Sequence, residues 1–175
     1  LMELLSNETI SLRAPEPEDL ELLYHWENKP EWWGLGNTLA PYSRYLLKEY
    51  IAESHRDLFD LKQLRLMIDY RPTGATVGML DLYDFEPHHR RAGVGILIDP
   101  VYQKNGLATE ALGLLIRYAF SFLKLRQLYV HIPVGNEASK TLFTRCGFTV
   151  TGILTDWIAT EDGYSDVLVM QRINK

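Results

Sequence analysis

Cysteine is almost absent from this 175-residue chain, which contains only Cys146, so no disulfide can form within it. Metal-binding spacings such as C-x-x-C and H-E-x-x-H do not occur. There is also no run of about 18 apolar residues, the length that a membrane-spanning helix needs. The acidic segment Leu1–Leu5 is too short for a signal peptide. We therefore expect a cytoplasmic protein with no metal and no membrane partner.

Basic residues are in the minority, because 18 lysines and arginines face 23 acidic residues and give a net charge of −5. Such a chain lacks the positive surface that binds nucleic acid non-specifically, whereas a small cationic substrate would suit it. Repeats, low-complexity stretches and Gly/Ser linkers are absent as well. With 46% hydrophobic residues, the length predicts one core, so residues 1–175 are expected to form a single domain.

The apolar pattern predicts an α/β (α+β) fold with a mixed, mostly antiparallel sheet of about seven strands and flanking helices. The expected strands are 9–14, 64–70, 76–83, 93–98, 128–134, 148–155 and 164–172. The expected helices are an amphipathic segment at 20–26, one that begins at Ser43 and extends to Leu58, one at about 106–123 and one at 136–145. The helix after Ile98 acts as a crossover, so the strands that it joins should be parallel neighbours.

The segment Gln103–Ala108 lies where a strand has ended and a long helix begins. The first backbone N–H groups of a helix have no partner within it, and Gly106 allows a ligand to approach closely. Such a helix start can bind phosphate, with Lys104 adding a positive charge. By itself, however, the pattern Q-x-x-G-x-A is weak and is more typical of an ordinary helix start.

A second signature follows at a fixed place, because Asn136–Lys140 opens a helix that ends in Cys146-Gly147-Phe148. Together the two signatures resemble the GCN5-related N-acetyltransferases over nearly the whole chain. The resemblance implies a splayed central parallel pair of strands, with acetyl-CoA as co-substrate between them. The residues that it implies for coenzyme binding are Ile96, Leu97, Ile98, Gln103, Lys104, Asn105, Gly106, Leu107, Ala108, Thr109, Asn136, Ser139 and Lys140.

Further segments resemble the ribosomal-protein and spermidine acetyltransferase branch of this family, namely Ile10–Ala14, Asp19-Leu20, His89-Arg90 and Gly163–Val167. This implies acetyl transfer to a primary amine, with a small polyamine or diamine favoured. A protein N-terminus is a second possible acceptor, and a non-catalytic acyl-CoA-binding module is an alternative of another class. The individual short motifs also have structural explanations, since Gly93 and Gly95 can form a bulge and Asn136 can cap its helix.

Catalysis on a primary amine requires removal of a proton, because the ordinary pKa of an amine is near 10.4. Asp84 is the first candidate for the base, and Asp81, Glu86 and His89 are nearby alternatives. The branch often carries a glutamate at the start of the loop strand, where this chain has Gly93. Backbone N–H groups around Leu97 and Ile98 would stabilise the oxyanion.

Phe143 occupies the position at which many family members carry a tyrosine that protonates the departing thiolate. Water or Tyr102 would have to replace it. Cys146 is expected to pack in the core rather than to react.

The acceptor site is expected in an aromatic and acidic segment, because carboxylates and aromatic faces attract cationic amines. The candidates are Glu31, Trp33 and Tyr42, together with Asp84. The same residues could instead cover the edge of the sheet and lie in solvent. The C-terminal hairpin Tyr164–Arg172 could pair with a second copy of the chain, which leaves a homo-oligomer open.

Overall fold

The computed structural model describes residues 4–30, 39–103 and 105–175, so the expected site residues Glu31, Trp33 and Lys104 lie outside the described part. The strands are β1 (Ile10–Arg13), β2 (Leu64–Tyr70), β3 (Ala75–Glu86), β4 (Arg91–Ile98), β5 (Gln127–Pro133), β6 (Thr149–Thr160) and β7 (Gly163–Ile173). The α-helices are α1 (Leu20–Glu27), α2 (Arg44–Glu53), α3 (Leu58–Leu61), α4 (Leu107–Ser121) and α5 (Glu137–Arg145), and the 3-10 helices are η2 (Pro17–Asp19) and η4 (Pro100–Tyr102). None of the helices in these ranges is long and apolar enough to cross a membrane.

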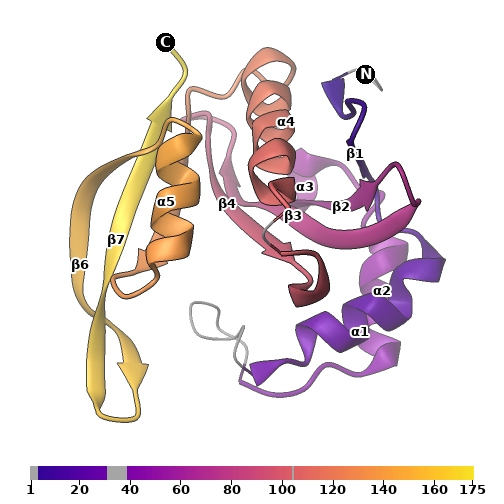
Figure 1. Cartoon of the computed structure of the whole chain (residues 1–175), viewed down its shortest axis with the longest axis horizontal. Helices are drawn as coiled ribbons and strands as arrows, with labels where there is room; N and C mark the ends of the chain where they lie inside the picture. The colour runs from indigo at the N-terminus through magenta and orange to yellow at the C-terminus, as the bar shows by residue number, and fades with distance from the viewer. Residues whose placement is uncertain (1–3, 31–38, 104) are drawn as a thin grey trace.

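The seven strands form one sheet in the order β1-β2-β3-β4-β5-β7-β6. Every neighbouring pair is antiparallel except β4 and β5, which are parallel and are joined by the crossover helix α4. In Figure 1, α4 and α5 lie side by side, and the hairpin of β6 and β7 extends beyond the rest of the sheet. The expected mixed, mostly antiparallel sheet with flanking helices is therefore confirmed.

The parallel pair is joined only at its start, where Arg91–Gly93 pairs with Gln127–Tyr129. Beyond Gly93, β4 continues to Ile98 and β5 continues to Pro133 without further pairing between them. The two strands thus diverge toward their carboxyl ends, as expected for a splayed pair. Because they are parallel, the segments that follow them, before α4 and before α5, lie at the same open end.

Apolar side chains cover both faces of the sheet, because successive residues of a strand point to opposite faces. On one face, the core includes Leu80 and Val94 with Leu112 and Leu115 of α4. On the other face, Met67 and Met79 pack with Leu23 and Trp26 of α1 and Leu47 of α2. We refer to this second surface as the α1/α2 face.

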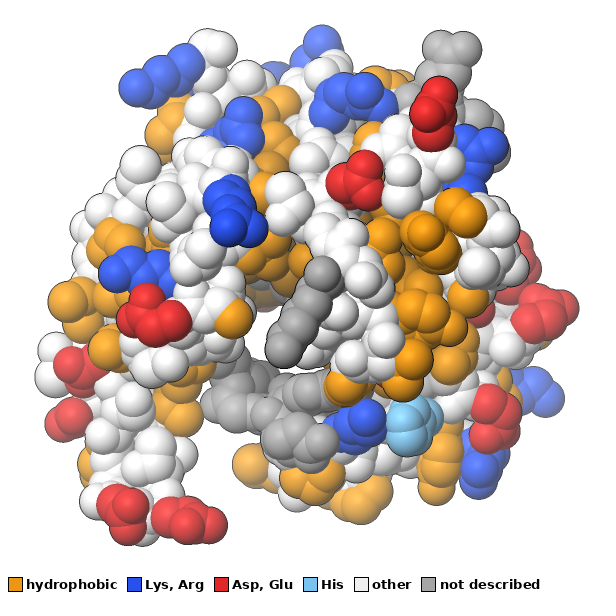
Figure 2. Space-filling view, viewed as in Figure 1, with side chains coloured by type: hydrophobic (Ala, Val, Ile, Leu, Met, Phe, Trp, Pro, Cys, Tyr) orange, Lys and Arg blue, Asp and Glu red, His pale blue; other side chains and the backbone are white. Residues whose placement is uncertain are grey.

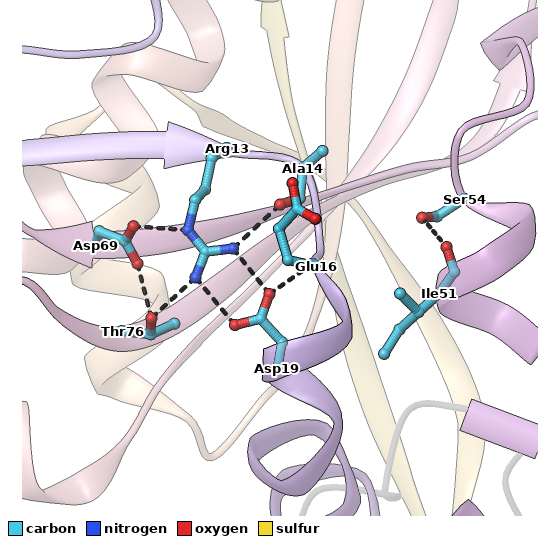
Figure 3. Close-up of polar contacts among 8 residues, drawn as sticks. All are labelled: Arg13, Ala14, Glu16, Asp19, Ile51, Ser54, Asp69 and Thr76. Carbon is cyan, nitrogen blue, oxygen red and sulfur yellow. Dashed lines mark hydrogen bonds and ion pairs between the residues drawn. The ribbon is translucent and has the colours of Figure 1, made fainter. Parts of the chain in front are cut away.

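A partly buried ion-pair network links the N-terminal end of α1 to the edge of the sheet (Figure 3). The guanidinium of Arg13 on β1 donates to both carboxylate oxygens of Asp19 over 2.8 and 2.9 Å, and to Asp69 on β2 over 2.6 Å. Thr76 on β3 accepts from Arg13 and donates to Asp69. Asp19 is only 3% exposed, so this network holds η2 and α1 against three strands.

Three elements differ in extent from the sequence expectation, and one of them is β3, which continues past the expected end at residue 83 to Glu86. The second helix ends at Glu53, where the hydroxyl of Ser54 donates to the carbonyl of Ile51 (Figure 3) and Asp57 caps the separate helix α3. The strand expected to end near residue 155 continues as β6 to Thr160, because a bulge with Asp156 at φ 51° allows pairing with β7 to resume. β6 forms one edge of the sheet, with β7 as its only partner among the described strands.

Candidate active site

The segment between β4 and α4 forms the first part of the site. Asp99 caps η4 by accepting from the backbone N–H of Val101, and the side-chain amide of Gln103 donates to the carbonyl of Ile98 over 3.1 Å. Asn105 donates in turn to the carbonyl of Tyr102. The side chains of Gln103 and Asn105 thus stabilise the loop by hydrogen bonding to nearby backbone carbonyl groups.

Gly106 is the N-cap of α4 and lies in the left-handed region at φ 73°. Among the described residues, no side chain caps the helix there, and a Cβ atom on Gly106 would have none of their heavy atoms within 4 Å. The first backbone N–H groups of α4, at Leu107, Ala108 and Thr109, have no partner within the helix. A 15-residue helix that begins in this way fits a pyrophosphate group.

The backbone of β4 presents alternate residues to the gap. The N–H of Asp99 donates to the carbonyl of Val77 on β3 over 2.8 Å. Since hydrogen bonding alternates along an antiparallel pair, Leu97 is also directed toward β3, whereas Ile96 and Ile98 direct their N–H groups toward β5. Of the three expected β4 residues, Ile96 and Ile98 can therefore offer backbone N–H groups to a ligand in the splay, and Leu97 cannot.

The start of α5 lies at the same open end. The side chain of Asn136 accepts from the backbone N–H of Ser139 over 3.1 Å and so caps the helix. Lys140 donates its backbone N–H to the carbonyl of Asn136 and is half-buried. The carbonyl side of the Asn136 amide is thus used for capping, which leaves its NH2 group as the part suited to contact a ligand.

An acidic cluster lies on the α1/α2 face beside the splay. Arg65 on β2 donates two hydrogen bonds to Asp81 on β3 over 2.7 and 2.9 Å, and a third to Glu27 of α1 over 2.5 Å. The ring of Tyr50 lies 5.2 Å from the guanidinium carbon. Burial, together with Asp81 and Glu27, raises the pKa of Tyr50 to about 12.

Two phenols lie where β4 and β5 diverge. Tyr83, Gly93 and Tyr129 are register partners across β3, β4 and β5, and the two rings meet edge to face with centroids 6.2 Å apart. Burial raises the pKa of both phenols, and the nearby charge of Asp84 contributes to each shift. Asp84 itself is exposed at φ 48°, in the bulge that shifts the register of β3 after Tyr83.

The structure shows where several residues discussed from the sequence lie. The bulge lies in β3 at Asp84 rather than at Gly93 or Gly95, which stay in register with Tyr83 and Asp81. Glu86 accepts from the backbone N–H of His88, so its carboxylate stabilises the turn after β3. No three His, Cys, Asp or Glu side chains in the described ranges are grouped as metal ligands.

The structure also describes three other residues that the sequence analysis singled out. Tyr42 packs against the α1/α2 core, and its backbone is held by the side chain of Asn28 through bonds of 2.7 and 3.1 Å. Phe143 is 2% exposed, with its ring edge to face against Phe148. Burial raises the pKa of the Cys146 thiol, and Arg172 offsets part of the shift.

Sequence reasoning did not select Arg65 or Tyr83 as site residues. Tyr83 and Asp81 alternate on one face of a strand that also carries Met79, a pattern that alone predicts a half-buried strand. The missing information is the register that places these residues opposite Gly95 and Gly93. The available signal in the sequence was the pair of glycines, Gly93 and Gly95, in one strand and Tyr83 in the preceding strand. This signal becomes specific only once the pairing of the two strands is known.

The family comparison agrees with this geometry. Residues 9–149 match the model of the acetyltransferase (GNAT) domain family, which covers most of the chain and includes both β4 and the start of α4. The chain therefore belongs to the acetyltransferase (GNAT) domain family. Membership of this family supports acetyl-CoA as the co-substrate.

Individual relatives narrow the class of reaction. The chain is 29% identical over 153 residues to the spermidine N(1)-acetyltransferase of Escherichia coli, covering 85% of this chain and 77% of that protein. The crystal structure of the Vibrio cholerae spermidine N-acetyltransferase in complex with CoA and spermine superposes with a TM-score of 0.86 at 25% identity, covering 96% and 97% of the two chains. A shorter match of 29% over 97 residues, 55% of this chain and 54% of the other, is to the ribosomal-protein-serine acetyltransferase of E. coli. The chain is an N-acetyltransferase, which sets aside the non-catalytic alternative.

Proposed function

We propose that the chain transfers the acetyl group of acetyl-CoA to a small cationic amine of the polyamine or diamine class. The observation that carries this proposal is the charge on the α1/α2 face beside the divergence of β4 and β5. Three carboxylates, Glu27, Asp81 and Asp84, lie around Tyr50 and Tyr83. Among the described residues they outnumber the two guanidinium groups of this region, that of Arg65 beside Glu27 and Asp81 and that of Arg91 near Tyr129. The excess of negative charge next to aromatic rings favours an ammonium group.

Coenzyme binding is assigned to the open end of the splay. The N–H groups of Leu107, Ala108 and Thr109 would hold the pyrophosphate, with Gln103 and Asn105 fixing the loop. The N–H groups of Ile96 and Ile98 and the side-chain amide of Asn136 would hold the pantetheine arm and the thioester oxygen. A preorganised N–H donor at a developing oxyanion supplies roughly 10²–10³-fold in rate.

Asp84 is assigned the role of drawing the ammonium group to the site and accepting its proton, directly or through water. Its left-handed backbone at φ 48° places an exposed carboxylate close to both phenols at the divergence point. A neutral amine nitrogen can then attack the thioester carbonyl. The spermidine acetyltransferases among the relatives support an acceptor with more than one cationic group.

The experiment incubates the protein with acetyl-CoA and a panel of spermidine, diamines, aminoglycosides, amino acids and short peptides, and detects acetylated products by mass spectrometry. Spermidine or a diamine should be the preferred acceptor. Acetylation confined to peptide N-termini would overturn the small-amine assignment and favour the ribosomal-protein type of acceptor.

Asp84→Asn provides the residue-level test, with Asp156→Asn as its matched control. Asp156 is also an exposed aspartate at φ 51° in a strand bulge, and asparagine tolerates this backbone equally at both positions. We expect kcat/KM for the amine to fall about 10- to 100-fold in Asp84→Asn. Asp156→Asn should retain wild-type kinetics, and an equal loss in both variants would exclude a specific role of Asp84.

Self-association of the chain is proposed from its edge strand. β6 carries the exposed apolar side chains of Val150, Ile153 and Trp157, and one of the related structures is a dodecamer of the Vibrio cholerae enzyme. Figure 2 shows acidic side chains at the lower end of the β6–β7 hairpin, and the turn between the two strands contains Glu161 and Asp162. Light scattering should give a mass above that of one chain, and a monomer at micromolar concentration would contradict this.

A further inference from the structure

The ring of Tyr83 lies directly on the backbone of β4. A Cβ atom built on Gly93 would lie 2.3 Å from Cε2 and 2.5 Å from Cζ of Tyr83, and one built on Gly95 would lie 4.0 Å from Cε1. The two flanks of the ring thus cover the two glycines. The hydroxyl group, which Cζ carries between these flanks, must point across β4 toward β5.

This direction places the hydroxyl of Tyr83 at the vertex of the splay. Gly93 and Tyr129 form the last pair before β4 and β5 separate, and the ring of Tyr83 reaches to the ring of Tyr129. A thioester that enters the gap from the open end would have its sulfur and acetyl group directed at this vertex. Phe143 carries no hydroxyl, and its buried ring packs on Phe148.

We propose that the hydroxyl of Tyr83 donates a hydrogen bond to the thioester sulfur of acetyl-CoA as the acetyl group leaves, an inference that rests on the proposed acetyl transfer. The amine nitrogen forms a bond to the carbonyl carbon, and the carbon–sulfur bond breaks. The sulfur departs with the electron pair as a thiolate, which accepts a hydrogen bond from the phenol hydroxyl of Tyr83. The proton lost by the amine passes through water to the thiolate, so the products are the amide and the free thiol.

The surroundings of Tyr83 keep its hydroxyl in the donor form. Burial is the largest cause that raises the pKa of this phenol to about 12, and Tyr129, Asp84 and Asp81 add to the shift. A thiol has an ordinary pKa near 8.5, so the departing thiolate would not take the proton from Tyr83. The phenol therefore acts as a hydrogen-bond donor and not as a general acid.

The ring of Tyr83 can lie over β4 only because β4 carries glycine there. Any side chain at position 93 would have to displace the ring, because its Cβ would be closer to three ring atoms than van der Waals contact allows. Tyr83 and Gly93 hence depend on each other, because Gly93 has no side chain and so leaves space on β4 for the phenol ring of Tyr83 from β3.

The first test compares Tyr83→Phe with Tyr129→Phe, which removes the other phenol of the same ring pair. For the acceptor that the panel identifies, kcat should fall about 10- to 100-fold in Tyr83→Phe, with the KM for acetyl-CoA within about threefold. Tyr129→Phe should stay within about threefold of wild type in both constants. Equal kcat in Tyr83→Phe and wild type would overturn the inference.

A second test separates hydrogen-bond donation from packing. Site-specific 3,5-difluorotyrosine at position 83 lowers the phenol pKa with little change in shape, and an ionised phenolate cannot donate. The alkaline limb of the kcat profile should therefore move into the assay range, while the same substitution at position 129 leaves the profile unchanged. An unshifted profile for position 83 would assign Tyr83 to packing alone.

A third test uses Gly93→Ala, which should displace the ring and reproduce the loss seen in Tyr83→Phe. The double variant should lose no more than either single variant, because both remove the same contact. Gly113→Ala on α4, where a Cβ meets no heavy atom within 4 Å, is the control and should be fully active. Additive losses in the double variant would contradict the pairing.

The outcomes also distinguish the two proposals. If wild type acetylates a peptide instead of a small amine, the acceptor assignment fails, and the Tyr83 comparison is made on that peptide with the same expected loss. If wild type turns over no acceptor while acetyl-CoA binds, the proposed function and this inference fall together. If wild type is active and Tyr83→Phe matches it, the inference alone is overturned.

Discussion

The indole N–H of Trp26 donates a hydrogen bond to the carboxylate of Asp99 over 2.9 Å. Trp26 is fully buried in α1, and Asp99 follows β4 directly before the loop assigned to the pyrophosphate. Burial alone would raise the pKa of Asp99, but bonds from Trp26 and from the N–H of Val101 outweigh it, so the pKa is lowered. The helix on the acceptor side and the loop on the coenzyme side are thus joined through one carboxylate.

Asp99→Ala should weaken both sides of the site together. It leaves the buried N–H of Trp26 without its acceptor, which costs about 2 kcal/mol, or roughly 4–8 °C in Tm for a chain of this size. The KM for acetyl-CoA should rise as well, because the loop loses its anchor. Asp99→Asn keeps an acceptor oxygen and should lie close to wild type in scanning fluorimetry and in kinetics. A wild-type Tm for Asp99→Ala would contradict the coupling.

Gly106→Ala should raise the KM for acetyl-CoA by about tenfold or more, because a methyl group narrows the helix start where a phosphate must approach closely. The left-handed backbone also costs about 1–2 kcal/mol for any residue with a Cβ. Gly74→Ala is the control, since Gly74 lies at φ 74° in the turn between β2 and β3 with equally open surroundings. Both variants should lose similar stability, and only Gly106→Ala should lose coenzyme affinity in calorimetry. Equal affinity in the two variants would remove Gly106 from the coenzyme site.

The sequence was sufficient to predict the seven strands and the crossover helix because these elements follow from local patterns. Alternation marks the strands, and the apolar period after Gly106 marks α4. The bulges at Asp84 and Asp156 escaped prediction because a left-handed aspartate has no distinct local signature. Each bulge extends its strand past the expected end, which is why β3 and β6 are longer than predicted.

The candidate site was predictable on the coenzyme side and much less so on the acceptor side. The segment Gln103–Ala108 is contiguous, so one stretch of sequence carries its chemistry. The cluster around Arg65 and Tyr83 is assembled from α1, α2 and three strands, and only the register brings its members together. Long-range pairing of this kind is not encoded in the spacing of any single segment.

The stability of the protein should fall in acid as Asp19 is protonated. Burial would raise the pKa of Asp19, but hydrogen bonds from Arg13 and from the N–H of Glu16 outweigh it and lower the pKa below its ordinary value. A carboxyl whose pKa is lower in the folded state stabilises it at pH values above its unfolded pKa, and this contribution is lost as pH falls through the folded pKa. Asp19→Asn should therefore cost about 2 kcal/mol at pH 7, and the difference from wild type should shrink below pH 4. Urea unfolding at several pH values measures this, with Asp162→Asn in the β6–β7 turn as a control expected to match wild type.

Cys146 should be unreactive in the folded protein and dispensable for catalysis. The thiol is 8% exposed at the end of α5, and burial raises its pKa, so little thiolate forms at pH 8. Alkylation by iodoacetamide should be at least about tenfold slower in the native protein than in guanidinium, and acetyl-CoA should not change the native rate. Cys146→Ala should keep kcat within about threefold of wild type, because in the proposed mechanism the amine attacks the thioester directly and no acyl-cysteine forms. Rapid alkylation that acetyl-CoA prevents, together with loss of turnover in Cys146→Ala, would instead indicate a covalent route through this thiol.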